Sequence, residues 1–132
     1  MPVSELSLIA FPTRELFLEK VDEFDLIIFD RYKRRGILPR SYLENVRSYV
    51  EAGGAVLIAA GPDYATADSI YRSALGDIVP GEPTGRVIED GFIPELTDIG
   101  NRHPVTAGLD MLAPPPEEGD GPGWGRWFRL VE

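Results

Sequence analysis

Residues 49–62 (YVEAGGAVLIAAGP) contain the end of a helix, a double-glycine turn and a short apolar run. Gly53 and Gly54 can adopt the left-handed backbone that closes a helix, because neither carries a Cβ atom that would clash. The helix is predicted to begin near Pro39, a residue type favoured in the first helical turn. Its apolar stripe recurs at helical spacing: Leu43, Val46 and Val50. Residues 55–60 (AVLIAA) then have the length and composition of a buried strand.

A second apolar run, residues 25–30 (DLIIFD), is predicted to be a strand covered on both faces, as in a parallel sheet. The other predicted elements are a strand over 6–11, a helix with Phe17, Val21 and Phe24 on one face, a helix over 70–75 ending near Gly76, and strands over 86–89 and 124–131. Alternating strands and helices predict right-handed βαβ units with helices on both faces of the sheet. We therefore expect a three-layer α/β/α domain with a mainly parallel, flavodoxin-like sheet.

Composition excludes several classes of partner. The 132 residues fit a single domain over 1–132, and 43% of them are hydrophobic, enough for a core. A net charge of −9 disfavours nucleic acid and anionic lipid surfaces. No signal peptide is recognisable, and no apolar run reaches the ~20 residues of a membrane helix. We expect no direct membrane insertion by this chain, and its localisation stays undetermined.

The C-terminal part differs from the rest in composition. Residues 113–123 (APPPEEGDGPG) are rich in proline, glycine and acid, which predicts a flexible loop. Three aromatic side chains follow: Trp124, Trp127 and Phe128. Core packing is the default interpretation of them, yet the chain stops before any element that could cover such a strand. We expect the natural domain to continue past Glu132, and uncovered aromatics here would favour a homo-oligomer.

The order of these elements resembles the class I glutamine amidotransferase-like superfamily. The likeness lies in residues 24–36 (FDLIIFDRYKRRG), 49–62, 71–85 and 103–109 (HPVTAGL). More narrowly, it is similar to the putative glutamine amidotransferase domain of uncharacterised bacterial membrane proteins. The resemblance implies a parallel sheet, a parent protein associated with a bacterial membrane, and a nucleophile elbow after the strand at 55–60.

The chain departs from this family at the elbow. Active relatives place a cysteine there, which attacks the glutamine amide with help from a histidine base. Here the positions are Ala59, Ala60, Gly61 and Pro62, and the chain contains no cysteine at all. Pro62 also lacks the N–H that would serve as an oxyanion donor. Glutaminase activity is therefore not expected, and no residue is assigned a catalytic role.

A dense basic cluster follows the strand at 25–30. Four cations stand close together in an acidic chain: Arg31, Lys33, Arg34 and Arg35. Asp30 and Tyr32 belong to the same strand end, where open α/β sheets bind their ligands. The cluster predicts a site for a small anion or an acidic protein partner. The alternative is a solvated loop that balances neighbouring acid, with Asp30 paired to a neighbouring arginine.

Other candidate groups have weaker patterns. His103, the only histidine, lacks a neighbouring nucleophile or further metal ligands, and we expect its ring to bond backbone in a turn. An acidic group matches no calcium loop: Glu89, Asp90, Glu95 and Asp98. We predict no metal and no cofactor.

Three hypotheses on function follow. The first is a non-catalytic, degenerate amidotransferase-like domain that binds, regulates or scaffolds within a larger membrane-associated bacterial protein. The second is a hydrolase or transferase of another class that uses the strand-end loops. The third is a structural domain that self-associates through its C-terminal aromatic strand.

Overall fold

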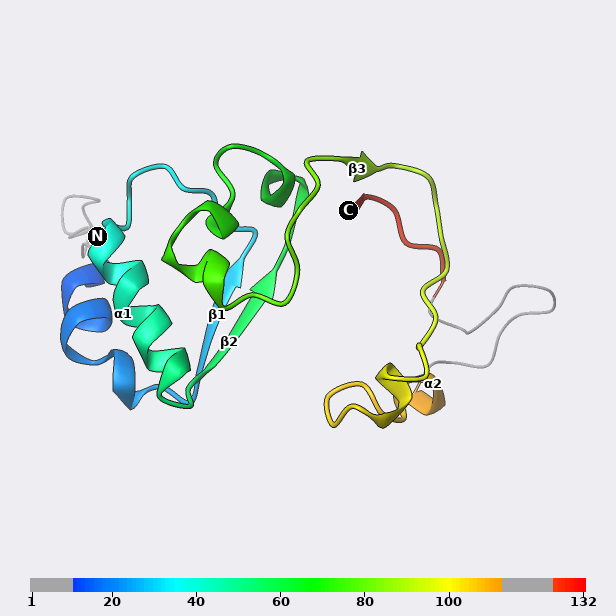
Figure 1. Cartoon of the computed structure of the whole chain (residues 1–132), viewed down its shortest axis with the longest axis horizontal. Coiled ribbons are helices and arrows are strands. Elements are labelled where there is room, and N and C mark those ends of the chain that lie inside the picture. The colour runs from blue at the N-terminus through cyan, green and yellow to red at the C-terminus, as the bar shows by residue number, and fades with distance from the viewer. Residues whose placement is uncertain (1–10, 113–124) are drawn as a thin grey trace, which may run out of the picture.

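The computed structural model describes residues 11–112 and 125–132 of the chain (Figure 1). Their elements are, in order, η2 (Glu15–Glu19), η3 (Val21–Glu23), β1 (Leu26–Asp30), α1 (Arg40–Glu51), β2 (Ala55–Ala59), η4 (Pro62–Ala65), η5 (Ile70–Arg72), η6 (Ala74–Asp77), β3 (Val87–Ile88), η7 (Gly100–Arg102), α2 (Leu109–Leu112) and β4 (Leu130–Val131). The η elements are single turns of 3₁₀ helix, except η2, which is a π turn. The predicted strand at 6–11 and loop at 113–123 lie outside the described residues, apart from Phe11.

Strands β1 and β2 pair in parallel, as the two apolar runs predicted. The register places Ile27 opposite Val56 and Phe29 opposite Ile58. These side chains point to one face of the pair, and Phe29 is buried. The connection from β1 to β2 runs through α1, which is the βαβ arrangement that parallel strands require.

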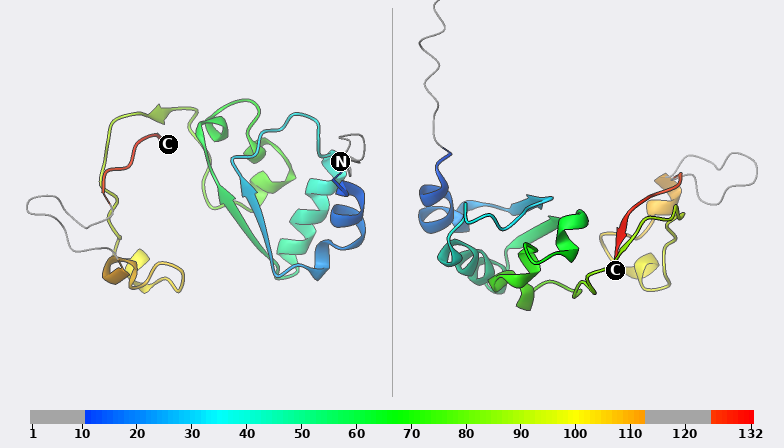
Figure 2. Two further views of the ribbon diagram at one scale, coloured as in Figure 1. Left: turned by 180° about the vertical axis from the view of Figure 1, so that it is seen from behind. Right: turned by 90° about the horizontal axis from the view of Figure 1, so that it is seen from above.

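Helix α1 covers that face of the sheet. Its buried side chains are Leu43, Val46 and Tyr49, which recur at the spacing of one helical face. They join Phe29, Val21, Ile70 and Leu75 in a single cluster of buried apolar residues. The turns η2 and η3 pack on α1, and η6 packs on its other side (Figure 2). The core therefore lies between α1 and one face of β1 and β2.

Tyr49 joins the helix to the starts of both strands. Its hydroxyl donates to the carbonyl of Phe24 at 2.8 Å and accepts from the N–H of Ala55 at 3.2 Å. The double glycine makes this contact possible. Gly53 takes the left-handed backbone with φ of 109°, and a Cβ atom on Gly54 would collide with the Tyr49 ring.

The opposite face of the sheet is uncovered by the described residues. Leu26, Ile28 and Leu57 point to it and are each about half exposed, at 48%, 55% and 51%. The prediction that residues 25–30 are covered on both faces is therefore wrong for the part of the chain that the structure describes. A three-layer, flavodoxin-like arrangement stays a proposal, because the described elements supply one helical layer and a two-stranded parallel sheet.

The predicted helix over 70–75 is instead two 3₁₀ turns, η5 and η6. Two serine side chains explain the difference. Ser69 accepts from the N–H of Tyr71 at 3.2 Å, and Ser73 accepts from the N–H of Leu75 at 3.2 Å. Such local bonds compete with the i to i−4 bonds of an α-helix, so each serine starts a new turn. The predicted end near Gly76 agrees with η6, which ends at Asp77.

A second sheet lies apart from this core (Figure 1). Strands β3 and β4 pair antiparallel, with Val87 opposite Val131 and Ile88 opposite Leu130. An isolated bridge between Phe92 and Trp127 extends the pairing. The predicted strands over 86–89 and 124–131 are thus two residues long each, and Trp124 lies outside the described residues. None of the described helices is long and apolar enough to cross a bilayer.

Gly54→Ala is expected to destabilise the protein by about 1–3 kcal/mol, because the new methyl group overpacks against a buried ring that is held at both ends. Urea unfolding followed by circular dichroism measures this loss. Gly81→Ala is the matched control, since a Cβ atom there meets nothing within 4 Å. Equal stability of the two variants would show that the Tyr49 ring does not occupy this position.

Candidate functional site

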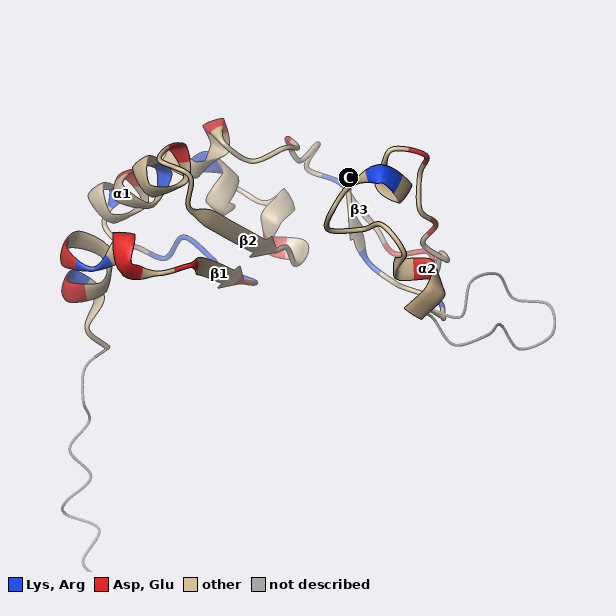
Figure 3. Cartoon of the chain, turned by 90° about the horizontal axis from the view of Figure 1, so that it is seen from below, with Lys and Arg blue, Asp and Glu red and all other residues tan. Residues whose placement is uncertain are grey.

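A cavity of about 550 Å³ lies between α1 and the turns η5 and η6. Four arginines from three segments line it: Arg34 from the connection after β1, Arg40 and Arg47 from α1, and Arg72 from η5. Two carboxylates line it as well, those of Glu44 and Asp77. The site is therefore cationic within a chain whose net charge is −9. Figure 3 shows Lys and Arg positions along α1 and the connection after β1.

Backbone pairing between two loops brings Arg34 and Arg72 together. Lys33 forms an isolated bridge with Ser69, and the N–H of Arg34 donates to the carbonyl of Asp68 at 2.9 Å. Arg34 Nη1 then donates to the carbonyl of Arg72 at 2.6 Å. Neither guanidinium has a carboxylate partner among the described residues. Both keep N–H donors that a ligand could use.

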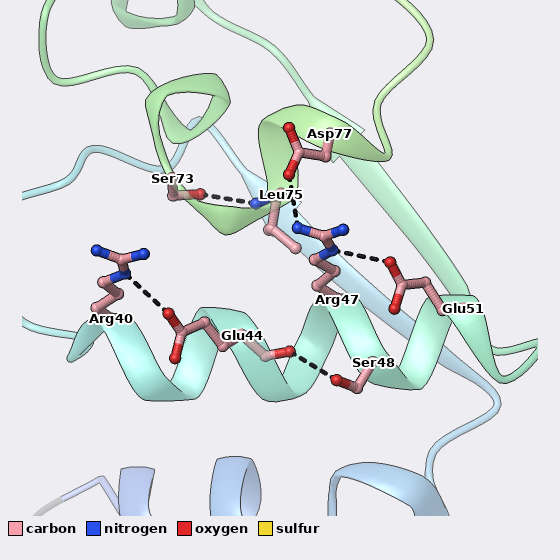
Figure 4. Close-up of polar contacts among 8 residues, drawn as sticks. All are labelled: Arg40, Glu44, Arg47, Ser48, Glu51, Ser73, Leu75 and Asp77. Atoms are coloured by element: carbon pink, nitrogen blue, oxygen red, sulfur yellow. Dashed lines mark hydrogen bonds and ion pairs between the residues drawn. The ribbon is translucent and has the colours of Figure 1, made fainter.

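Arg40 and Arg47 reach the cavity from α1, and both are already paired (Figure 4). Arg40 Nε donates to Glu44 at 2.8 Å. Arg47 contacts two acids, Glu51 at 2.8 Å and Asp77 at 2.6 Å, and the second contact links α1 to η6. The hydrogen bond that Arg47 donates to the Glu51 carboxylate raises the pKa of the Arg47 guanidinium.

The carboxylates and the serine hydroxyl that line this cavity are already engaged in contacts with other groups of the chain. Its two carboxylates are each engaged by an arginine, so neither is a free general base. Ser73, the hydroxyl in its wall, donates to the carbonyl of Ile70 at 2.5 Å and accepts from Leu75. A serine nucleophile needs a base to take its proton, and this hydroxyl proton is held by a backbone oxygen.

The members of the predicted anion cluster, residues 30–35, have different surroundings in the structure. Of its members only Arg34 lines the cavity. Lys33 pairs with Asp63 at 2.6 Å, and Tyr32 packs edge to face on Phe29 with centroids 5.6 Å apart. Burial raises the pKa of the Tyr32 hydroxyl.

The remaining three members of that cluster lie at the surface. Arg35 is exposed, and Asp30 ends β1 opposite Ala59. The ion pair expected between Asp30 and an arginine does not form among the described residues. Arg31 takes a left-handed backbone with φ of 48°, which is uncommon outside glycine.

The predicted elbow forms a plain turn. Ala59 ends β2, Ala60 and Gly61 follow in extended or irregular backbone, and Pro62 opens η4. None of these four has the left-handed backbone of a strained strand-to-helix turn. Arg31 lies against it, since a Cβ atom on Gly61 would be 3.4 Å from Arg31 Cγ.

The weaker candidates occupy structural positions. His103 Nδ1 accepts from the N–H of Val105 at 3.2 Å, which confirms the expected ring-to-backbone bond in a turn. Within 11–112 and 125–132, no three histidine, aspartate or glutamate side chains are grouped so that they could hold a metal ion. Trp127 and Phe128 are 51% and 64% exposed.

Arg40, Arg47 and Arg72 were missed from the sequence. Arg40 and Arg47 stand seven residues apart, so a helical plot of 40–51 would have placed them on one face. Arg72 gave no such signal, because its place depends on the pairing of two loops.

Comparison with known proteins adds no assignment. No family model matches the chain, and no curated protein or solved structure is significantly similar to it. The resemblance to the amidotransferase-like superfamily stays a prediction from residues 24–109.

Leu75→Ala is expected to cost about 2–5 kcal/mol of stability, because Leu75 is fully buried beneath the cavity wall and truncation leaves a void. Asp77→Asn removes the ion pair with Arg47 and should leave stability nearly unchanged, since water screens both exposed partners. Thermal unfolding in parallel compares the two. A larger loss for Asp77→Asn would mean that charge, not apolar packing, holds η6 on α1.

Proposed function

We propose that this chain is a non-catalytic binding domain that captures an anionic ligand in the arginine-lined cavity. One observation carries the proposal: four arginines from three segments of the chain line a single cavity of about 550 Å³. Guanidinium groups bind carboxylate and phosphate oxygens through paired N–H donors, which suits them to this task. If these arginines only balanced nearby acid at the surface, there would be no reason for them to line one cavity from three segments of the chain.

The different bonding of the four arginines supports this assignment. Arg40 and Arg47 are held in place by carboxylates of α1 and η6, so they offer oriented charge. Arg34 and Arg72 contact backbone carbonyls alone among the described residues, so they can form new ion pairs at little cost. A ligand with two negative charges would match the excess of four arginines over two carboxylates.

The scaffold proposed for this site is a degenerate amidotransferase-like domain, within a larger membrane-associated bacterial protein. The helix–Gly-Gly–strand order and the alanines and glycine at the elbow support it. Loss of the nucleophile leaves the domain a binding, regulatory or scaffolding role. The proposed second candidate is self-association through the C-terminal strand, supported by the exposure of Trp127 and Phe128.

Titration calorimetry with inorganic phosphate and with citrate tests the binding proposal. Saturable binding is expected, and it should weaken as salt is added because the contacts are ionic. Arg34→Glu and Arg72→Glu should each reduce affinity by about tenfold or more, since each replaces attraction with repulsion.

Arg102→Glu is the matched control, because Arg102 lies in η7 outside the cavity. It changes the net charge by the same amount and should leave the affinity within about twofold of the parent. Equal losses for all three variants, or no saturable binding of either anion, would contradict the proposal.

A further inference from the structure

No strand among residues 11–112 and 125–132 pairs with the outer edge of β2, the edge that faces away from β1. The N–H of Arg31 donates to the carbonyl of Ala59 at 2.9 Å, so the backbone of Ala59 faces β1. Backbone direction alternates along a strand, and therefore Leu57 also faces β1 while Val56 and Ile58 face away. Among the described residues, β2 has no other neighbouring strand. The N–H and C=O groups of Val56 and Ile58 thus lack partners in the described part of the chain.

An apolar slot runs along this edge. A cavity of about 420 Å³ is enclosed by β2 and by residues 78–81, which follow η6. The Tyr64 hydroxyl donates to the carbonyl of Gly81 at 3.3 Å and joins the two walls. None of the residues that line the slot is charged, in a chain with 22 acidic and 13 basic residues. Side chains that entered the slot would therefore have to be apolar.

We propose that this slot binds an extended apolar segment of a partner protein, which adds as a strand to β2. Unpaired N–H and C=O groups at strand spacing recognise the backbone of an extended chain. The apolar walls recognise alternate side chains, because these point to one side of a strand. Because β2 has five residues, the partner strand that pairs with it is expected to be of similar length.

The negative net charge of this chain favours a partner protein over a second copy of the chain as the bound strand. Two copies would each bring a net charge of −9, and their repulsion opposes edge-to-edge pairing. An acidic residue, Glu82, also directly follows the wall of the slot in sequence. The complementary ligand is therefore an apolar strand with lysine or arginine at its ends.

This site is independent of the arginine cavity. The two cavities lie on different sides of η6 and share no lining residue. The first is proposed to bind anions through guanidinium groups, and the second to bind an apolar strand through backbone hydrogen bonds. Either proposal can therefore fail while the other stands.

A titration of the ¹⁵N-labelled full chain with the acetylated, amidated heptapeptide KVTVTVK tests the proposal. The amide signals of Val56 and Ile58 should shift and become protected from hydrogen exchange, with saturation below about 1 mM. The same peptide with its three central amides N-methylated should bind at least about tenfold more weakly, because it cannot donate hydrogen bonds. The peptide EVTVTVE should also bind more weakly.

Two protein variants complete the test. Val79→Lys places a charge in the slot wall and should weaken binding of KVTVTVK, whereas Val105→Lys adds the same charge at an exposed position outside the slot and should leave binding unchanged. If circular dichroism shows that Val79→Lys is misfolded, the test is instead the comparison of KVTVTVK with its N-methylated form, both measured on the unsubstituted protein. Equal binding of the N-methylated peptide overturns the proposal, as does the absence of shifts at Val56 and Ile58. So does a dimer by light scattering in which these two amides are already protected.

Discussion

The contact of the Tyr49 hydroxyl with the starts of both strands is the constraint on which the described core depends. It ties the last turn of α1 to Phe24, just before β1, and to Ala55, the first residue of β2. The Tyr49 hydroxyl oxygen thereby joins α1, the residue before β1 and the start of β2. The other buried residues of α1 are Leu43 and Val46. Gly54 is part of the same constraint, because a side chain there would displace the ring. A one-residue slip of β2 against β1 would break the contact and turn every apolar side chain of β2 to the other face.

The two proposed sites follow from this arrangement. With Tyr49 near the C-terminal end of α1, the polar face of the helix is oriented so that Arg40 and Arg47 line the same cavity as Arg34 and Arg72. With the register fixed, the backbone of Val56 and Ile58 is turned outward to the slot. The turn η6 contributes residues to both cavities, and its Leu75 is buried in the core cluster with Val46 of α1. One buried contact thus orients both a cationic cavity and an uncharged strand edge.

Sequence patterns were sufficient for the elements that local chemistry determines. The apolar runs predicted β1 and β2, and the glycine pair predicted the end of α1 to within two residues. Consecutive apolar residues could not show that Leu26, Ile28 and Leu57 would face outward, because coverage depends on elements elsewhere in the chain. The helix over 70–75 failed because Ser69 and Ser73 bond locally. Residue spacing gave no sign that Lys33 would pair with Asp63, or that Arg34 alone of the basic cluster would line the cavity.

Hydrogen exchange of the free protein, resolved by residue along β2, tests the register most directly. The amides of Leu57 and Ala59 should exchange slowly, because they donate to β1 in the register that Tyr49 sets. The amides of Val56 and Ile58, one residue away from each, should exchange rapidly. This alternation is the expected result. Slow exchange at Val56 and Ile58 with rapid exchange at Leu57 and Ala59 would mean a register shifted by one residue, and it would contradict the role assigned to Tyr49.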